Sequence, residues 1–154
     1  MKSKTLFIFI CLLSAIVSCE SSIDQFDTEK DPLKGKIGGE DWEYASGNAR
    51  FNVITNYLSG IMVAKGVQEP CAIRLSGDAH LTFQVTAERG TFNLGNFNGP
   101  EIIFNTAAGA QRFTASGGFI QIAAIDSRQA LGYINATFDD DNYVQGAFLV
   151  DICQ

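Results

Sequence analysis

Three neighbouring acidic residues near the end of the chain could bind a metal ion. Asp139, Asp140 and Asp141, followed by Asn142, concentrate the hard oxygen ligands that Ca²⁺ prefers. The run lacks the alternating ligand spacing and the distal bidentate Glu of a dedicated calcium loop. Asp and Asn are also the residues that a tight turn between two strands requires. The three aspartates are therefore weak metal candidates, and we expect no cofactor.

A second group, Ser76, Asp78 and His80, contains the residue types of a hydrolase triad. His80 is the only histidine, so acid–base catalysis by histidine would depend on it. On an extended strand, however, alternate side chains stand side by side about 7 Å apart, which is too far for a direct proton relay. No two acidic residues stand out as a glycosidase pair either. We predict a surface turn here, and no catalytic residue in the chain.

The cysteines Cys71 and Cys153 are candidates for a disulfide. An oxidising compartment favours their pairing, which would close an 82-residue separation and stabilise the fold by roughly 4 kcal/mol. Two buried free thiols are the alternative. A reactive or metal-binding pair is disfavoured, because neither cysteine belongs to a CxxC motif or lies near a histidine.

The N-terminal segment has the organisation of an export signal. Two lysines precede an apolar core over residues 6–13, which is too short to span a membrane. Ile16, Val17 and Ser18 then precede Cys19, and this order resembles the lipobox of bacterial lipoproteins. The resemblance implies cleavage of residues 1–18 and lipid attachment at Cys19. An ordinary secretory signal with a chance cysteine is the alternative.

Residues 19–33 are polar and acidic without periodicity, which predicts a flexible tether. Removing residues 1–18 from the 154-residue chain leaves 136 residues and changes the net charge from −6 to −8, because two lysines are lost. Such a charge disfavours nucleic acid and anionic membrane surfaces as partners. We expect the membrane contact to come from the lipid, on either the periplasmic or the outer face of the outer membrane.

Residues 34–154 are predicted to form one all-β domain. Gly38 and Gly39 indicate a tight turn between strands at 34–37 and 40–44, in which Trp42 is expected to be a core residue rather than a ligand platform. Residues 48–64 carry apolar residues at helical spacing. Gly60 and the run of β-branched residues favour instead two strands, at 49–54 and 58–64.

Further strand patterns recur down to the C-terminus, bounded by Gly, Pro, Asn or Asp. They cover residues 71–77, 80–87, 90–95, 101–107, 111–116, 118–125, 131–138 and 143–153. We therefore expect an antiparallel β-sandwich or barrel-like domain of about 8–10 short strands with Greek-key or meander connections.

The last two strands are predicted to form a closing hairpin. Side-chain parity and a three-residue loop at 140–142 would pair Phe138 with Val144, Gly132 with Val150 and Ile134 with Phe148, with Asn142 in the left-handed conformation. The opposite face of this hairpin carries Tyr133, Leu131 and Leu149 and is too apolar to be wholly solvated. We expect another sheet or a partner to cover it.

The segments GKIGGEDW, GTFNLG, GGFIQIAAIDSRQALGYINATF and GAFLVDIC together resemble a family of small all-β lipoproteins of unknown function from Bacteroidetes. This resemblance implies a fold and an envelope location, and it brings no catalytic residues. We expect a non-enzymatic, lipid-anchored envelope domain with a structural or accessory role. The alternative is a glycan- or protein-binding module that uses the face around Tyr133 and Leu149, and a hydrolase is the weakest possibility.

Overall fold

The computed structural model describes residues 27–75 and 77–154 of the chain. The predictions for the signal segment 1–18, for Cys19 and for Ser76 lie outside the described residues. Of the expected tether, residues 27–33 are described, and Leu33 at its end is already fully buried. The folded domain therefore begins slightly before residue 34.

The described residues form eleven strands and two short 3₁₀ turns. The strands are β1 Lys34–Ile37, β2 Glu40–Glu43, β3 Ser46–Asn52, β4 Tyr57–Val63, β5 His80–Thr86, β6 Gly90–Asn93, β7 Glu101–Asn105, β8 Arg112–Thr114, β9 Gly117–Ile125, β10 Gln129–Asp139 and β11 Asn142–Cys153, and the 3₁₀ turns are η2 Pro70–Ala72 and η3 Ala107–Gly109.

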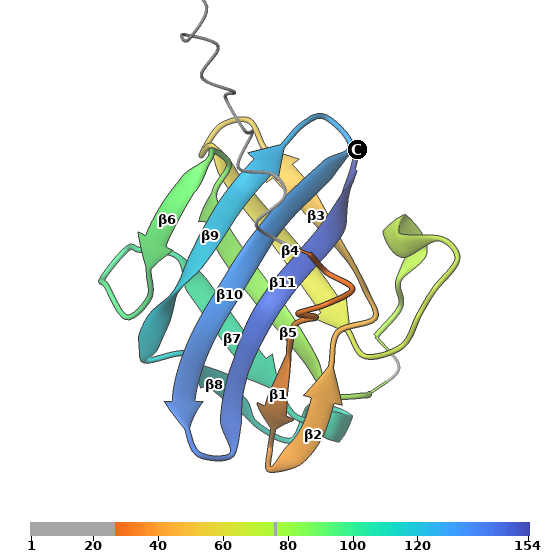
Figure 1. Ribbon diagram of the computed structural model, residues 1–154, viewed down its shortest axis with the longest axis vertical. Helices are drawn as coiled ribbons and strands as arrows, with labels where there is room; N and C mark the ends of the chain where they lie inside the picture. The colour runs from red at the N-terminus through yellow and green to blue at the C-terminus, as the bar shows by residue number, and fades with distance from the viewer. Residues whose placement is uncertain (1–26, 76) are drawn as a thin grey trace, which may run out of the picture.

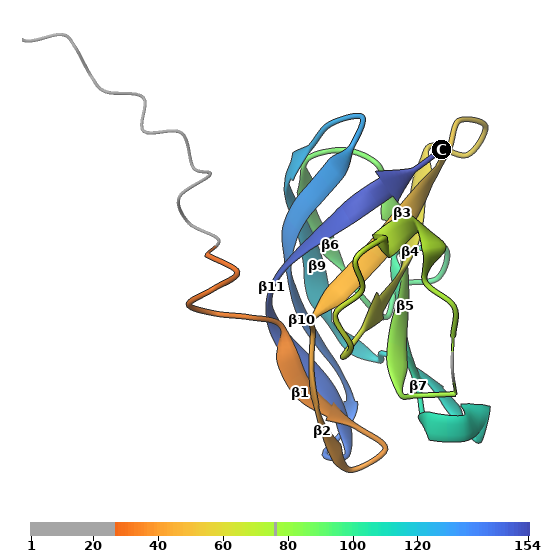
Figure 2. The ribbon, with the colours of Figure 1, turned by 90° about the vertical axis from the view of Figure 1, so that its right-hand side faces the viewer.

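All strands belong to one curled sheet with the order β6-β9-β10-β11-β3-β4-β5-β7-β8, while β1 pairs with β11 and β2 with β1. The sheet folds over so that the half formed by β6, β9, β10 and β11 faces the half formed by β3, β4, β5, β7 and β8 (Figures 1 and 2). This half-barrel confirms the all-β prediction. The sheet is not purely antiparallel, because β11 and β3 pair in parallel over three residues.

The core lies between the two halves of the sheet. Phe83 from β5 meets Phe148 from β11 across it, with ring centroids 6.1 Å apart. Trp42 is only 5% exposed, and its indole Nε1 donates a hydrogen bond to the Ala79 carbonyl at 3.1 Å. The predicted core role of Trp42 is thus confirmed, and its polar atom is satisfied at the core boundary.

The predicted opening hairpin is also confirmed. Gly38 and Gly39 join β1 to β2 with φ angles of 64° and 83°, which a primed turn requires and glycine adopts without strain. The two strands predicted within residues 48–64 are confirmed as β3 and β4, and the alternative helix is not formed. The strand expected at residues 71–77 is wrong: Pro70 begins the 3₁₀ turn η2 there, since its ring fixes φ and removes a ladder donor.

The register predicted for the closing hairpin is wrong. Asp139 pairs directly with Asn142 across a two-residue turn, and a bulge between Thr137 and Asp139 absorbs the difference in side-chain parity. Phe138 is therefore 42% exposed rather than buried. Asn142 begins β11 instead of adopting the left-handed conformation, and it is 2% exposed.

In the observed register, each of three cross-strand pairs of β10 and β11 combines a small residue with a larger one. Gly132 lies opposite Phe148, Ile134 opposite Gly146 and Ala136 opposite Val144. A Cβ on Gly132 would lie 2.7 Å from the Phe148 ring and 2.2 Å from the Gln121 carbonyl oxygen. The ring of Phe148 therefore occupies the space that a side chain at position 132 would need.

We predict that Gly132→Ala lowers the free energy of unfolding by about 1–3 kcal/mol, because the added methyl overpacks the core against both a ring and a backbone carbonyl. Urea unfolding followed by circular dichroism measures this change. Gly117→Ala on the neighbouring β9 is the control, since its nearest contact would be at 3.9 Å. Equal stability of both variants and the wild type would contradict the packing described.

Candidate functional site

The acidic tip of the closing hairpin is exposed and engaged in turn contacts. The Asp139 carboxylate accepts hydrogen bonds from the Asp141 backbone N–H at 3.0 Å and from Asn142 Nδ2 at 2.8 Å. Asn142 Oδ1 and the Asp141 carbonyl in turn accept from the backbone N–H groups of Gly38 and Gly39, each at 2.9 Å. Within residues 27–75 and 77–154, no group of three or more His, Cys, Asp or Glu side chains is placed to hold a metal ion.

Of the second candidate group, the structure describes Asp78 and His80. His80 is the first residue of β5, and its imidazole Nδ1 lies 2.9 Å from the backbone carbonyl oxygen of Asp78. The backbone carbonyl of Asp78 thus fixes the orientation of the imidazole.

The predicted pair Cys71 and Cys153 does come together, with the sulfurs at disulfide distance and the Cα atoms 5.6 Å apart. The bond ties η2 to the end of β11, beside β3. A second tie is a hydrogen bond from Asn48 Nδ2 to the Pro70 carbonyl at 2.6 Å. Together they hold the segment after Pro70 against the outer face of the sheet.

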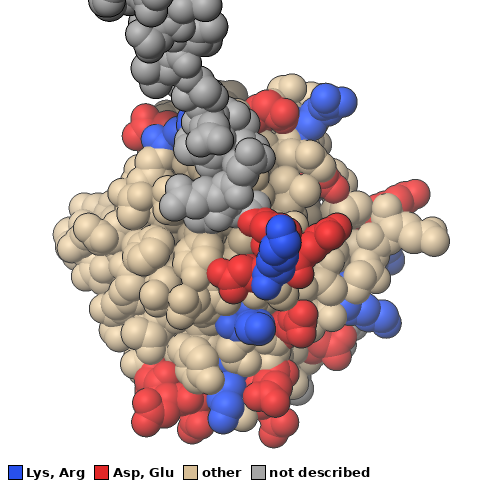
Figure 3. Space-filling model, in the orientation of Figure 1, with Lys and Arg blue, Asp and Glu red and all other residues tan. Residues whose placement is uncertain are grey.

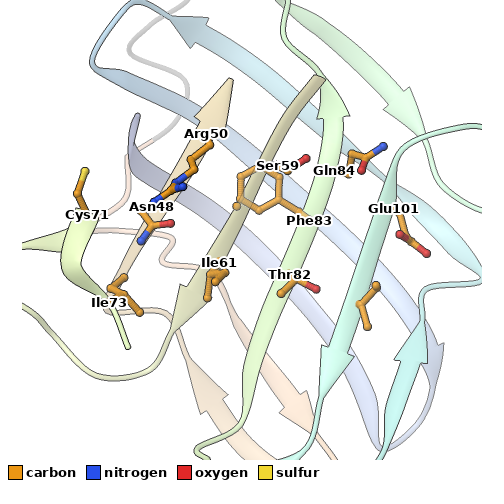
Figure 4. A pocket seen from close by; sticks show the side chains of 12 residues that line it. Asn48, Arg50, Ser59, Ile61, Cys71, Ile73, Thr82, Phe83, Gln84 and Glu101 are labelled. Carbon is orange, nitrogen blue, oxygen red and sulfur yellow. The ribbon is translucent and has the colours of Figure 1, made fainter. Parts of the chain in front are cut away.

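This segment forms the wall of a groove of about 470 Å³ on the outer face of β3, β4, β5 and β7. One row of cross-strand neighbours in it runs Arg50, Ser59, Gln84 and Glu101. Figure 4 shows the two charged residues at opposite ends of that row. The second row is formed by Asn48, Ile61, Thr82 and Ile103, with Ile73 on the wall.

The groove combines polar and apolar side chains, and its two charged residues lie far apart. Arg50 and Glu101 are separated by three strand spacings, about 14 Å, so they are too far apart to act on one bond. Glu101 is the single carboxylate among the lining residues, whereas glycoside hydrolysis needs two carboxyl groups across the scissile bond. The row between them offers one hydroxyl and one amide.

The other half of the molecule presents a different surface, which we call the neutral face. It is the outer side of β6, β9, β10 and β11, four strands that contain no Lys, Arg, Glu or His and only two aspartates, Asp139 at the hairpin tip and Asp151 near the other end. Figure 3 shows uncharged atoms over the left and middle of this face, with charged residues along the upper and lower edges and to the right. Its central side chains are Phe119, Gln121, Leu131, Tyr133, Asn135, Gln145 and Leu149.

The centre of the neutral face is an aromatic pair surrounded by amides. The rings of Phe119 and Tyr133 stack with centroids 6.2 Å apart and an interplanar angle of 19°. The Tyr133 hydroxyl accepts a hydrogen bond from Gln145 Nε2 at 2.9 Å. Asn135 is the direct cross-strand neighbour of both Phe119 and Gln145, so rings and amides lie in one continuous patch.

Tyr44 fixes the edge of this face. Its hydroxyl donates a hydrogen bond to the Leu149 carbonyl, which links the residue after β2 to the outer strand β11. Burial, with a smaller effect of the Asp151 carboxylate, raises the pKa of the Tyr44 phenol above its ordinary range. The phenol therefore remains a neutral donor at physiological pH.

Comparisons with protein-family models, curated proteins and solved structures found no match to this chain. In the part of the chain that the structure describes, no helix is long and apolar enough to cross a membrane. The geometry of the two outer faces is thus the basis on which a function is proposed.

Of these sites, sequence patterns indicated the disulfide and the face around Tyr133 and Leu149. They did not indicate the groove, because its two rows combine residues from four separate strands. The alternation of β5, in which Thr82 and Gln84 interrupt buried Leu81, Phe83 and Val85, was the one signal of a polar outer row.

We predict that replacing both Cys71 and Cys153 by Ser lowers the free energy of unfolding by about 4 kcal/mol, because the unfolded chain loses a long loop constraint. Urea unfolding of the oxidised wild type and of the double variant measures the difference. A reductant should destabilise the wild type to the level of the variant and leave the variant unchanged. Equal stability of oxidised and reduced wild type would contradict the role of the bond.

Proposed function

We propose that this chain is a non-enzymatic binding domain of the bacterial cell envelope, anchored by lipid on Cys19, that binds a neutral glycan on the neutral face. The lipobox-like order of Ile16, Val17, Ser18 and Cys19 supports the anchor. The resemblance to small Bacteroidetes lipoproteins supports the envelope location. The stacked Phe119–Tyr133 pair among amide side chains supports the choice of ligand.

The observation that carries the proposal is the stacked Phe119–Tyr133 pair, which lies beside amide side chains on a face whose four strands contain only two charged residues. The whole chain has a net charge of −6, yet the four strands of the neutral face have only the two aspartates near their ends. Around Phe119 and Tyr133 the strands of this face carry no charged side chain, and Lys34 lies opposite Gln145 at the edge. A ligand centred on the two rings therefore avoids the desolvation cost of burying ions. The neutral face also provides no electrostatic attraction for an acidic or a basic ligand.

The chemistry of the remaining side chains fits a sugar. The faces of aromatic rings are electron-rich and accept the polarised C–H groups of a pyranose, while amides donate to and accept from its hydroxyl groups. Phe119 and Tyr133 supply the rings, and Asn135 and Gln145 supply the amides. A few placed polar groups around an apolar platform are the usual composition of a small-ligand site.

A protein partner is the competing occupant of this face. The centres of protein interfaces are rich in aromatic residues and poor in charge, as the neutral face is. The cross-strand amides Asn135 and Gln145 favour the glycan, because a flat protein surface would have to satisfy both of them in one fixed arrangement, whereas sugar hydroxyl groups can adapt.

We predict that the chain is retarded in native gels that contain a neutral polysaccharide, and that the affinity barely changes between low and high salt, because no ion pair contributes. Dextran, a mannan and a β-glucan are suitable neutral polymers, with an acidic polysaccharide for comparison. Tyr133→Ala should weaken binding roughly five- to tenfold, the value of one aromatic contact of about 1 kcal/mol.

Phe97→Ala is the matched control for this experiment, since Phe97 is an aromatic residue 97% exposed on the loop after β6 and outside the neutral face. Circular dichroism verifies that both variants fold. Retardation by the acidic polymer alone, or equal loss in both variants, would contradict the proposal. Isolation of a stable protein complex that Tyr133→Ala disrupts, with no glycan binding, would favour the protein partner.

The anchor is tested separately. Cys19→Ala should abolish incorporation of a labelled fatty acid and move the protein from the membrane fraction to the soluble fraction of the envelope. Binding to the neutral polysaccharide should be unchanged, because Cys19 precedes the described domain by several residues. Unaltered membrane retention of Cys19→Ala would count against the lipid anchor.

A further inference from the structure

One end of the half-barrel exposes aliphatic side chains on a turn. The β3–β4 connection presents Val53 and Ile54, which are 78% and 91% exposed, and Phe51 just before them is 45% exposed. Tight turns usually carry Gly, Pro, Asn, Asp or Ser, which satisfy the backbone conformation. Asn52 and Asn56 fulfil that need here, so nothing in the turn requires the two aliphatic residues.

The turn holds these side chains outward in a defined position. Asn52 Oδ1 accepts hydrogen bonds from the backbone N–H groups of Ile54 at 2.9 Å and Thr55 at 3.2 Å. Asn56 adopts a left-handed conformation with φ of 56°, and its carbonyl accepts from the Ala87 backbone N–H at 2.9 Å. The exposure of Val53 and Ile54 is therefore built into the turn.

A hollow of about 520 Å³ continues this apolar surface. Apolar side chains form most of its lining, with the polar residues Asp126, Ser127 and Gln154 at its margin; the apolar ones are those of Phe51, Val53, Ala87, Ile125 and Ile152. Figure 2 shows the C-terminal end of the chain beside the yellow β3–β4 turn. We call the turn and the hollow together the hydrophobic end. Isolated exposed apolar residues need no explanation, but a continuous apolar surface marks a contact site.

We propose that the hydrophobic end rests on a lipid bilayer, with Val53 and Ile54 inserted among the lipids. This inference depends on the lipid anchor at Cys19 that is part of the proposed function. It goes beyond that function, because it assigns a second membrane contact and fixes which end of the domain faces the bilayer.

The length of the N-terminal chain permits this arrangement. Asp31 and Leu33 are hydrogen-bonded to Ala147 on β11, at 2.8 and 3.0 Å. From Ala147 to Cys153 the strand rises about 20 Å over six residues. Residues 27–31 form a turn, in which the Asp31 backbone N–H donates to the Asp27 carbonyl at 2.9 Å. The eight residues from Cys19 to Asp27 could still reach about 27 Å, which exceeds this rise. A lipid on Cys19 can thus lie in the same membrane plane as the hydrophobic end.

The charges around this end indicate what kind of lipid it contacts. The two neighbouring connections carry Glu88 and Arg89 after β5, and Asp126 and Arg128 after β9. Two cations and two anions balance, so the rim has no net attraction for anionic headgroups. Insertion of aliphatic side chains is then the driving force, and the contact should form on zwitterionic lipids and tolerate salt.

The test places a tryptophan at the turn and follows its depth in vesicles. The full chain carrying Ile54→Trp is mixed with phosphatidylcholine vesicles, either ordinary or with brominated acyl chains, which quench indole emission on contact. We expect at least a twofold loss of the added emission in the brominated vesicles, at both low and high salt. Trp42 is buried in the core, so the wild type gives the background signal.

Phe97→Trp is the matched control. Phe97 is 97% exposed, but it follows β6, whose last residue Asn93 pairs with Phe119 near the start of β9, whereas Ile125 at the end of β9 lines the hydrophobic end. Its tryptophan should not be quenched. Equal quenching at both positions, or quenching at position 97 alone, would overturn the proposed orientation.

Two further variants separate this inference from the anchor on which it depends. A Val53→Ser and Ile54→Ser double variant of the lipidated chain should still sediment with vesicles and still bind polysaccharide, but its domain should no longer be held at the bilayer. To measure this, Phe51→Trp is introduced both into the wild type and into the double serine variant. The tryptophan at position 51 should be quenched by brominated lipids in the first protein and less so in the second. Cys19→Ala should lose sedimentation.

If the wild type sediments through its lipid but Ile54→Trp is not quenched, the orientation fails and the anchor stands. If the wild type carries no lipid and does not sediment, the anchor fails. If Ile54→Trp is not quenched and the wild type dimerises in sedimentation-velocity runs while the double serine variant does not, the hydrophobic end is an interface between copies of this chain instead.

Discussion

The fold depends on β11, because this strand joins the two halves of the curled sheet. One edge of β11 pairs with β10 along nearly its whole length. The other edge pairs first with β1, then with the segment around Leu33, and finally in parallel with β3. No other strand in the described residues has partners from so many parts of the chain. The disulfide from Cys153 to Cys71 secures the end of β11 where the sheet turns over.

The backbone of residues 31–33 can pair with the edge of β11 because it approaches Gly146 closely. Gly146 has a φ angle of 137°, and a Cβ there would lie 2.4 Å from the Pro32 carbonyl oxygen. A side chain at this position would push residues 31–33 away from β11 and open the join between the N-terminal segment and the sheet.

The sequence predicted those features that depend on neighbouring residues. The turn at Gly38 and Gly39, the strand at β5 and the pairing of Cys71 with Cys153 were predicted correctly. The register of the closing hairpin was wrong because a bulge at Phe138 changes parity without any local signature. The groove could not be predicted, since its residues become neighbours only after β3, β4, β5 and β7 are placed side by side.

The neutral face and the hydrophobic end can both be used in one orientation of the domain relative to the bilayer. The face lies along the length of β9, β10 and β11, whereas the hydrophobic end lies where β9 and β11 finish and β10 begins. A bilayer beneath the end would therefore leave the strands upright and the Phe119–Tyr133 pair open to the side. A bilayer lying flat against the face would cover that pair and exclude a polymer. The two proposals are compatible only because one uses the ends of the strands and the other their outer surface.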